Sequence, residues 1–275
     1  MDSKNIINQA LSIPRVAKRV AELKISVEQL EEAKIILLEI IQESKLPQEP
    51  KYITSFNVGH NGVITLTKIL SERGKALSIE NNIITQKISP INLNVEFSNM
   101  EQTKERVNFA LYFKQYKKQI EDEQILKGFF LYGEMGIGKS FIAQAMAVSL
   151  AKSGQKVAFL NVAELVSIMK SKFKTGTESF VEKLKTVENL FLDDIGAETI
   201  TTWFRDDMLL GILSTRMNNN KTTFFTSNYS FSELEKIESR TQGSKYPDKA
   251  KAARLMERIR ALSISVNIGG HNRRY

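Results

Sequence analysis

A glycine-rich run in the middle of the chain has the residue types that bind phosphate. The run reads Gly133, Glu134, Met135, Gly136, Ile137, Gly138, Lys139 and Ser140. It follows the apolar stretch 129–132, and a strand that turns through glycines into a helix directs backbone N–H groups and the helix dipole at one point. Polyphosphate fits there, with the lysine on the β- and γ-phosphates and the serine hydroxyl on Mg²⁺. The sequence therefore predicts a nucleotide site over 133–141, with Phe141 in the helix that follows.

A second apolar run, residues 190–192, ends in two carboxylates, Asp193 and Asp194. A central strand is buried on both faces, so acids at its tip need neutralisation, and Mg²⁺ is the cation that suits them beside a phosphate site. We expect Asp193 to bind the metal and Asp194 to orient and deprotonate the attacking water. The alternative is a pair of solvated acids in an ordinary loop.

Two later segments contribute further candidates. Asn228 follows a predicted strand and is placed to hydrogen-bond the γ-phosphate or the lytic water, although a cap on the next helix would explain it too. Arg254 and Arg258 lie four residues apart on a predicted helix over 250–259. An arginine that reaches the phosphate of a neighbouring subunit stabilises transition-state charge. The alternative is an exposed basic helix.

The elements that must position these residues alternate between strand and helix. The predicted strands cover residues 129–132, 157–161, 190–192, 222–226 and 262–266. Such alternation predicts an α/β fold with a five-stranded parallel sheet between helices. Ligands bind such sheets at the carboxyl ends of the strands, where the glycine-rich run falls.

The first part of the chain has another pattern. Apolar residues three and four apart over 15–44 predict amphipathic helix, as one long helix or two short ones. The pair Asn61 and Gly62, flanked by apolar residues, predicts a hairpin. An Asn-, Ser- and Ile-rich stretch over 80–103 is typical of a linker. We therefore expect a small, mainly helical domain with a linker over 1–95 and a nucleotide-binding domain over 96–275.

Composition excludes several classes of site. The chain has no cysteine and two isolated histidines, so neither a disulfide nor a zinc site is expected. No stretch reaches the ~18 apolar residues of a membrane span, and no signal-peptide pattern opens the chain, which predicts a cytoplasmic protein without membrane contact. The net charge of +8 suits contact with nucleic-acid phosphates and suits solubility equally well.

Several motifs, in order along the chain, resemble a known family. They are the glycine-rich run and residues 192–198, 203–206, 226–228, 252–259 and 272–274. Together they resemble the bacterial helicase loaders of the DnaI type, in the DnaC-like branch of the AAA+ ATPases, over about residues 80–275. The resemblance implies an AAA+ core behind a domain that binds the replicative DNA helicase, with ATP and Mg²⁺ as cofactors and self-association in the ATP-bound state.

The resemblance also implies roles for single residues. Asn228 is similar to the sensor-1 residue, and Arg258 takes the place of the arginine finger, with Arg254 as second choice. In this branch the region between the second strand and the acidic strand contributes to binding of single-stranded DNA. Here that region contains Lys170, Lys172 and Lys174, beside an aromatic residue that could stack on a base. A solvated helix face is the alternative.

Two departures from the family pattern change the expectation. Asp194 is one methylene shorter than the Glu that many AAA+ enzymes have at this position, so we expect slow, partner-controlled ATP hydrolysis that works as a switch. The amino-terminal domain of familiar DnaI proteins is built around a zinc site, and this chain has no cysteine to bind zinc. The expected function is that of an ATP-dependent loader, which helps place the helicase on single-stranded DNA during initiation or restart of replication. An IstB-like ATPase that assists transposition is the alternative.

Overall fold

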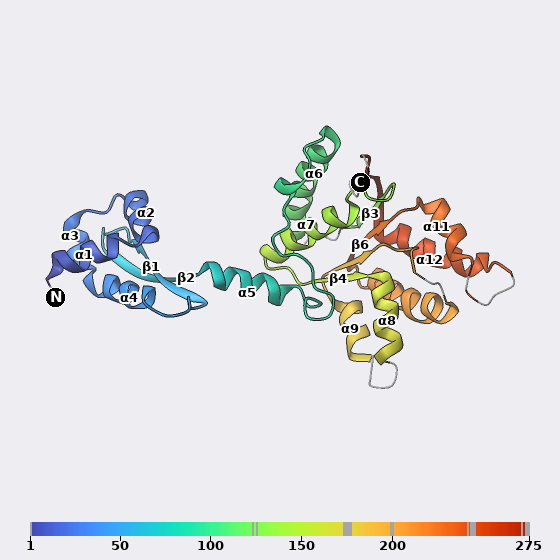
Figure 1. The fold of residues 1–275 in the computed structure, drawn as a ribbon, viewed down its shortest axis with the longest axis horizontal. Helices are drawn as coiled ribbons and strands as arrows, with labels where there is room; N and C mark the ends of the chain where they lie inside the picture. Colours follow the sequence, from blue (N-terminus) through green and yellow to red (C-terminus); the bar gives the residue numbers. More distant parts are fainter. Residues whose placement is uncertain are drawn as a thin grey trace. The chain divides into compact units, whose positions relative to one another are not determined.

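The computed structural model describes residues 2–122, 124, 126–172, 178–198, 201–240, 242, 246–270 and 272. The chain divides into two compact units, Met1–Ser78 and Ile79–Tyr275. Figure 1 shows the helices and strands of both. Among the described residues, none of the helices has the length and apolar content that crossing a membrane requires.

The first unit packs four helices against a two-stranded hairpin. Its elements are α1 (Ser3–Leu11), α2 (Pro14–Leu23), α3 (Val27–Glu32), α4 (Lys34–Ser44), β1 (Tyr52–Val58) and β2 (Ile64–Leu70). The prediction of one or two helices over 15–44 is wrong, because α2, α3 and α4 occupy this stretch. Lys24 ends α2 in the left-handed conformation with φ 52°, and Ser26 starts α3 through a capping box with Gln29.

The predicted hairpin is confirmed, with the two strands antiparallel and Val58 opposite Ile64. Phe56 is buried in the core of this unit, which the apolar faces of the helices complete. The hairpin therefore supplies one wall of a small hydrophobic core, and the amphipathic helices supply the other.

The second unit contains a five-stranded parallel sheet in the order β4-β5-β6-β3-β7. Its strands are β3 (Gly128–Tyr132), β4 (Val157–Asn161), β5 (Asn189–Asp193), β6 (Thr222–Ser227) and β7 (Ser263–Asn267). Each predicted strand is present within two residues of its expected ends, and the predicted fold class is confirmed. The register places Asn161 opposite Asp193 and Tyr132 opposite Ser227. The carboxyl ends of β3, β5 and β6 therefore meet at one edge of the sheet.

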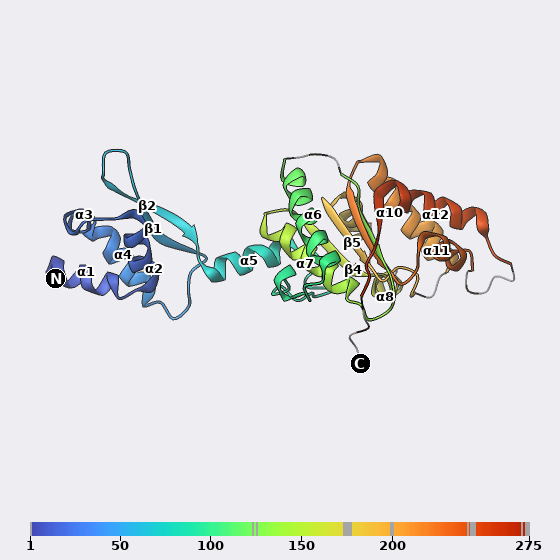
Figure 2. The same cartoon turned by 90° about the horizontal axis from the view of Figure 1, so that it is seen from above.

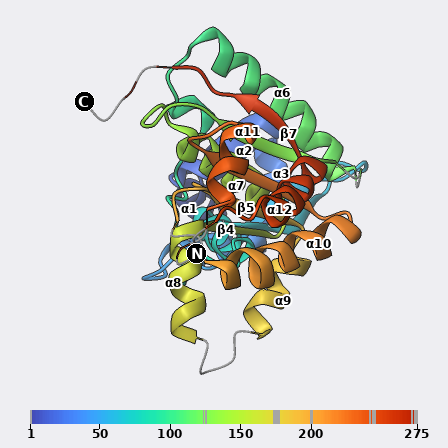
Figure 3. The same ribbon diagram turned by 90° about the vertical axis from the view of Figure 1, so that its right-hand side faces the viewer.

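Helices cover both faces of this sheet. They are η1 (Phe97–Asn99), α6 (Lys104–Glu121), α7 (Lys139–Lys152), α8 (Val162–Lys172), α9 (Glu178–Thr186), η2 (Trp203–Leu209), α10 (Leu210–Asn218), α11 (Phe231–Glu238) and α12 (Lys249–Leu262). A further helix, α5 (Glu72–Asn82), begins in the first unit and ends in the second. Phe129 of β3 packs in the core beneath α6 and α7, whereas its neighbour Phe130 packs in the core beneath α8 to α12. Figure 2 shows α6 and α7 on one side of the strands and α10 and α12 on the other, and Figure 3 shows α8 and α9 opposite α6.

The structure differs from the expected linker over 80–103 and from the expected division at residue 95. Residues 79–95 belong to the second unit. Ile83 is buried and forms a bridge with Val157 of β4, and Asn82 Nδ2 donates to the Ala151 carbonyl oxygen at 2.9 Å. The Thr85 hydroxyl donates to the Phe159 carbonyl oxygen and accepts from its N–H, at 2.9 Å each. Asn82, Ile83 and Thr85 therefore anchor this stretch to β4 and α7.

Candidate active site

The glycine-rich loop joins the end of β3 to the start of α7, as its sequence predicts. Gly136 and Gly138 have φ values of 78° and 93°, in the left-handed region that favours glycine. A Cβ added to Gly136 would lie 2.1 Å from the Asn272 side-chain oxygen, so a side chain at this position would force Asn272 to move and would be strained by the positive φ. The loop is thus held in one conformation at the amino-terminal end of α7, where backbone N–H groups lack partners within the helix.

Lys139 is the first residue of α7, and its ammonium group is buried at the centre of the site. Its Nζ donates to the carbonyl oxygens of Gly133 and Glu134 at 2.9 and 2.7 Å. It also donates to Asn228 Oδ1, beyond the end of β6, at 2.7 Å. The predicted phosphate-binding lysine therefore lies between its own loop and the neighbouring strand.

The two predicted carboxylates lie at the tip of β5, beside the end of β6. Asp193 is buried and accepts from the Thr226 hydroxyl at 2.7 Å. The same hydroxyl accepts from the Asp194 N–H at 2.8 Å, and Asp194 Oδ1 accepts from Asn228 Nδ2 at 3.1 Å. One polar network therefore joins Lys139, Asn228, Asp194, Thr226 and Asp193.

Asn228 does not cap the following helix. The N-cap of α11 is Ser230, whose backbone N–H donates to Glu233 Oε2 at 2.8 Å in a capping box. The carboxamide of Asn228 instead accepts a hydrogen bond from Lys139 Nζ and donates one to Asp194 Oδ1. Its geometry excludes the cap that the sequence left open.

Burial raises the pKa of Asp193, and so does the neighbouring Asp194, while hydrogen bonds from Thr226 and Ser140 and the charge of Lys139 oppose the rise. A cation placed beside a carboxylate in this environment stabilises its ionised form. The Ser140 hydroxyl is next to it, so two oxygen ligands lie together. No group of three or more His, Cys, Asp or Glu side chains in the described part of the chain could hold a metal. Two protein oxygens combined with phosphate oxygens and water suit Mg²⁺, which seldom uses an all-protein cage.

A cavity of about 180 Å³ opens at this edge of the sheet. Its lining joins the glycine-rich loop, the start of α7, Asp194 and Asn228. Ile137 is buried in the core and Phe141 packs against that core, so these two predicted residues face away from the cavity. Met135 is exposed and lines the cavity. The loop therefore contributes its backbone and Lys139 and Ser140 to the site.

Arg254 and Arg258 are not among the residues that line this cavity. Arg258, on α12, donates from Nε to the Ser214 hydroxyl at 3.4 Å and pairs with Glu257 at 3.1 Å. Arg254 is exposed on the same helix. A finger acts on a neighbouring subunit, so the assignment of Arg258 stays a prediction. Lys170 is exposed on α8, whereas the Lys172 side chain and Lys174 lie outside the described residues, as do Arg273 and Arg274.

Sequence reasoning missed two residues that shape the site. Thr226 connects the two carboxylates, and its signal was a hydroxyl at the carboxyl end of a strand that neighbours an acidic one. Arg106 of α6 is buried and its Nη2 donates to the Ile137 carbonyl oxygen, which holds the glycine-rich loop from outside. No local pattern marks Arg106, because its contact is 31 residues away along the chain.

A buried ionic network lies behind the site and was also missed. Glu198 follows β5 and accepts from the Gly196 N–H at 2.7 Å, and burial raises its pKa to about 7. Burial, together with the charge of Glu198, raises the pKa of Glu238 to about 8. Arg205 donates to the Glu238 carbonyl oxygen at 2.7 Å and to Asp206 Oδ1 at 2.6 Å.

Known proteins resemble mainly the second unit. Residues 98–275 match the model of the IstB-like ATP-binding protein family. The replicative helicase loader DnaI of Bacillus subtilis (strain 168) is 40% identical over 151 residues, 54% of this chain and 48% of DnaI. The replicative helicase loader DnaC of Escherichia coli (strain K12) is 24% identical over 172 residues, 61% of this chain and 69% of DnaC. The chain thus spans about half the length of DnaI.

Solved structures agree with the sequence comparison. A crystal structure of DnaI has a TM-score of 0.55 and 34% identity, covering 66% of this chain and 92% of that one. A putative primosome component from Streptococcus pyogenes serotype M3 has a TM-score of 0.53 and 29% identity, covering 72% and 98%. The predicted resemblance to DnaI-type loaders is confirmed. With the glycine-rich loop, the acidic strand and the sheet order all in place, this chain belongs to the family of IstB-like ATP-binding proteins and has the AAA+ fold of DnaI.

Proposed function

We propose that this protein is an ATP-dependent loader, which binds the replicative DNA helicase and helps place it on single-stranded DNA during initiation or restart of replication. One observation carries the proposal. The relative with 40% identity over 151 residues is itself a replicative helicase loader. The assembled network of Lys139, Asn228 and Asp194 supplies the ATPase chemistry that such a switch needs.

The residues of the site fit MgATP. The loop amides and Lys139 would hold the phosphates, and Ser140 and Asp193 would hold Mg²⁺. Bound Mg²⁺ would offset phosphate charge. Asp194 is oriented by Asn228 and would accept the proton of the attacking water. Because an Asp side chain reaches less far than Glu, we infer slow hydrolysis that serves as a switch.

We assign the partners as follows. The first unit contacts the helicase, and self-association in the ATP-bound state brings Arg258 to the site of a neighbouring subunit. Lys170, Lys172 and Lys174 contribute to the path of single-stranded DNA. The protein acts in the cytoplasm.

Size-exclusion chromatography with the replicative helicase of the same organism, with and without ATP, tests the proposal. We expect co-elution with the intact chain and a smaller helicase-bound fraction for Lys139→Ala when ATP is present. Lys152→Ala is the matched control, because Lys152 lies on the same helix α7 and pairs with Glu96, away from the cavity. Absence of co-elution in both conditions would overturn the loader assignment.

A second candidate is an ATPase that assists transposition. The family model carries the IstB name, and the insertion sequence IS21 putative ATP-binding protein of Pseudomonas aeruginosa is 27% identical over 150 residues. ATP hydrolysis that is stimulated by double-stranded DNA, together with no response to helicase, would favour this candidate. Stimulation by helicase with single-stranded DNA would favour the loader.

A further inference from the structure

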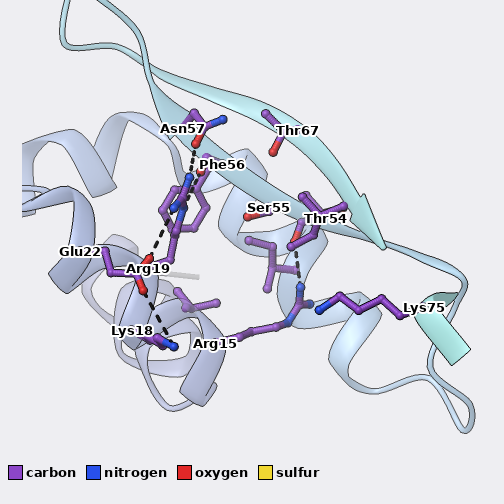
Figure 4. Close-up of a pocket in the computed structure, with 13 residues that line it drawn as sticks. Arg15, Lys18, Arg19, Glu22, Thr54, Ser55, Phe56, Asn57, Thr67 and Lys75 are labelled. Atoms are coloured by element: carbon purple, nitrogen blue, oxygen red, sulfur yellow. Dashed lines mark hydrogen bonds and ion pairs between the residues drawn. The ribbon is translucent and has the colours of Figure 1, made fainter. Parts of the chain in front are cut away.

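The first unit contains a basic hollow that the nucleotide site does not explain. It has a volume of about 460 Å³ and lies between α2, the hairpin and the start of α5. Arg15, Lys18, Arg19 and Lys75 line it together with one acid, Glu22, which pairs with Lys18 at 4.0 Å and with Arg19 at 3.4 Å. Two acids outside the lining, Glu43 and Glu72, pair with Arg15 at 3.8 Å and with Lys75 at 2.7 Å. Figure 4 shows the side chains of the lining around the opening, with the hairpin behind them. Four cations against three carboxylates leave a small excess of positive charge in a concave site, which favours an anionic ligand.

The two arginines are held in place by the edge of β1. Arg15 Nη1 donates to the Thr54 carbonyl oxygen at 2.9 Å, and Arg19 Nε donates to the Phe56 carbonyl oxygen at 3.3 Å. Arg19 Nη2 also donates to the Asn57 side chain. Arg19 Nη1 donates to Glu22 Oε2 at 3.4 Å, and Arg15 Nη2 lies 3.8 Å from Glu43 Oε2. Each guanidinium has five N–H donors, so some remain for a ligand. The guanidinium groups are therefore oriented before any ligand arrives, which reduces the entropy lost on binding.

The same bonds exclude one mode of recognition. The Thr54 N–H donates to Glu43 Oε2 at 2.6 Å, so side chains already occupy the donor of Thr54 and the carbonyl oxygens of Thr54 and Phe56 on this stretch of the β1 edge. A ligand strand cannot add to the sheet there. Recognition must use the side chains of the hollow.

The spacing of the charges matches an extended acidic peptide. Arg15 and Arg19 are one helical turn apart, about 6 Å along α2. Carboxylates on alternate residues of an extended chain lie about 6.6 Å apart on one side. Ile69 of β2 lines the hollow and is 47% exposed, so it offers an aliphatic contact between the charged groups.

Single-stranded nucleic acid fits less well. Grooves for such strands combine positive charge with exposed aromatic faces on which bases stack. The aromatic residue in this lining is Phe56, which is 2% exposed and belongs to the core. The floor instead carries hydroxyl groups from Ser55 and Thr67. Hydroxyl and aliphatic groups suit a peptide better than a base.

We propose that this hollow, formed by Arg15, Lys18, Arg19 and Lys75 over the hairpin, binds an extended acidic segment of a protein partner. The segment has carboxylates at alternate positions and an aliphatic side chain that packs on Ile69. The site is independent of the nucleotide site, so it stands or falls separately from the ATPase assignment.

The test measures binding of a fluorescein-labelled peptide of alternating glutamate and valine to the full chain, without nucleotide, by fluorescence anisotropy. The variant is the double charge reversal Lys18→Glu and Lys75→Glu. Their side chains are 80% and 57% exposed, and the ion pairs that they form with Glu22 and Glu72 lie at the surface, so the loss of these pairs costs little stability. The control is Lys4→Glu with Lys45→Glu, at exposed lysines of the same unit outside the lining.

We expect the peptide to bind the intact chain and the control equally, and the Lys18/Lys75 variant about tenfold more weakly, in line with two reversed rim charges. A peptide with glutamine in place of glutamate should bind at least tenfold more weakly. The proposal is overturned if the acidic peptide does not bind, or if the glutamine peptide binds equally well. It is also overturned, in favour of nucleic acid, if a thymidine oligonucleotide binds more tightly at the same salt and shows the same loss in the variant.

Discussion

Asn228 connects the phosphate-binding and the acidic parts of the candidate site. Its carboxamide joins the ammonium of Lys139 to the carboxylate of Asp194, so it positions both the phosphate-binding and the water-activating groups. A polar residue with one partner on each side orients a site without reacting itself.

Replacing Asn228 with Ala should therefore lower ATP hydrolysis by about a hundredfold, as loss of one oriented polar group does elsewhere, with a much smaller effect on ATP binding. Steady-state hydrolysis and calorimetric binding separate the two effects. Ser230→Ala serves as a control, because it removes the α11 cap without touching the network. If the two variants lost equal activity, Asn228 would have only a structural role.

Gly136 provides a second prediction at this scale. Gly136→Ala adds a Cβ at a φ of 78°, 2.1 Å from the Asn272 side-chain oxygen, so Asn272 must move and the loop is strained; calorimetric ATP binding should weaken by about tenfold while far-UV circular dichroism stays unchanged.

Gly154 is the matched control for backbone strain. Its φ is 93°, but nothing lies within 4 Å of an added Cβ. Gly154→Ala should lose about 1 kcal/mol of stability and bind ATP normally. Equal loss of binding in both variants would point to general strain instead of a clash in the loop.

Local sequence was enough to find the residues that carry chemistry at strand ends. The glycine-rich loop, the acid pair and Asn228 all follow apolar strands, and a parallel sheet gathers such ends at one edge. Arg106 and Thr226 could not be assigned in the same way. Their roles depend on partners 31 to 33 residues away along the chain, which only the sheet order brings close.

At the scale of elements, η2, α11 and α12 are joined by buried charge. Arg205 of η2 contacts the Glu238 carbonyl oxygen at the end of α11, and its Nη2 lies 3.6 Å from Asp248, which caps α12. Glu238 Oε1 is buried without a hydrogen-bond partner in the described structure. A buried carboxyl group with an oxygen that lacks a partner favours its protonated form.

This network should make the second unit less stable as pH rises. The pKa of Glu238 goes from 4.5 to about 8 on folding and that of Glu198 to about 7, so the folded state binds more protons than the unfolded state between those values. The free energy of unfolding should therefore fall from about pH 5 to pH 8. Asp206 affects the free energy of unfolding in a separate, more acidic pH range. Burial raises its pKa, but hydrogen bonds from Arg205 and Lys251 outweigh this and leave it lowered.

Glu238→Gln should remove up to about 1.4 kcal/mol per pH unit of this slope. Urea unfolding followed by the fluorescence of Trp203, the single tryptophan and a member of η2, measures it. Glu257→Gln is the control, since the Glu257 side chain is 69% exposed. An unchanged slope in Glu238→Gln would mean that Glu238 is ionised in the folded protein.

Element boundaries show where sequence patterns reach their limit. Hydrophobic runs located the five strands of the parallel sheet. The apolar periodicity over 15–44 did not reveal where α2 ends and where α3 begins. Those ends depend on the left-handed Lys24 and on Ser26, which a search for apolar spacing passes over. The stretch 80–103 was predicted as a linker because it is rich in Asn, Ser and Ile. Only the contacts of Ile83 and Thr85 with β4 show that its first part belongs to the second unit.

At the scale of the whole molecule, the proposed finger makes activity a property of the assembly. Arg258 bonds Ser214 and Glu257 of its own chain, away from its own cavity. If it serves a neighbour, each active site combines residues of two subunits.

Mixing two inactive variants tests this arrangement. Lys139→Ala removes the phosphate-binding lysine but keeps Arg258, whereas Arg258→Ala keeps the phosphate-binding pocket but lacks the arginine. Each variant alone should hydrolyse ATP at least tenfold more slowly than the intact chain. An equimolar mixture should regain a substantial fraction of activity, more at higher protein concentration, because mixed neighbours join an intact pocket to an intact arginine. Lys139→Ala mixed with Asp194→Asn is the control, since both changes lie in the same half and their mixture should stay inactive. Arg258→Ala that keeps full activity alone, or a first mixture no faster than the control, would show that Arg258 belongs only to the packing of α12.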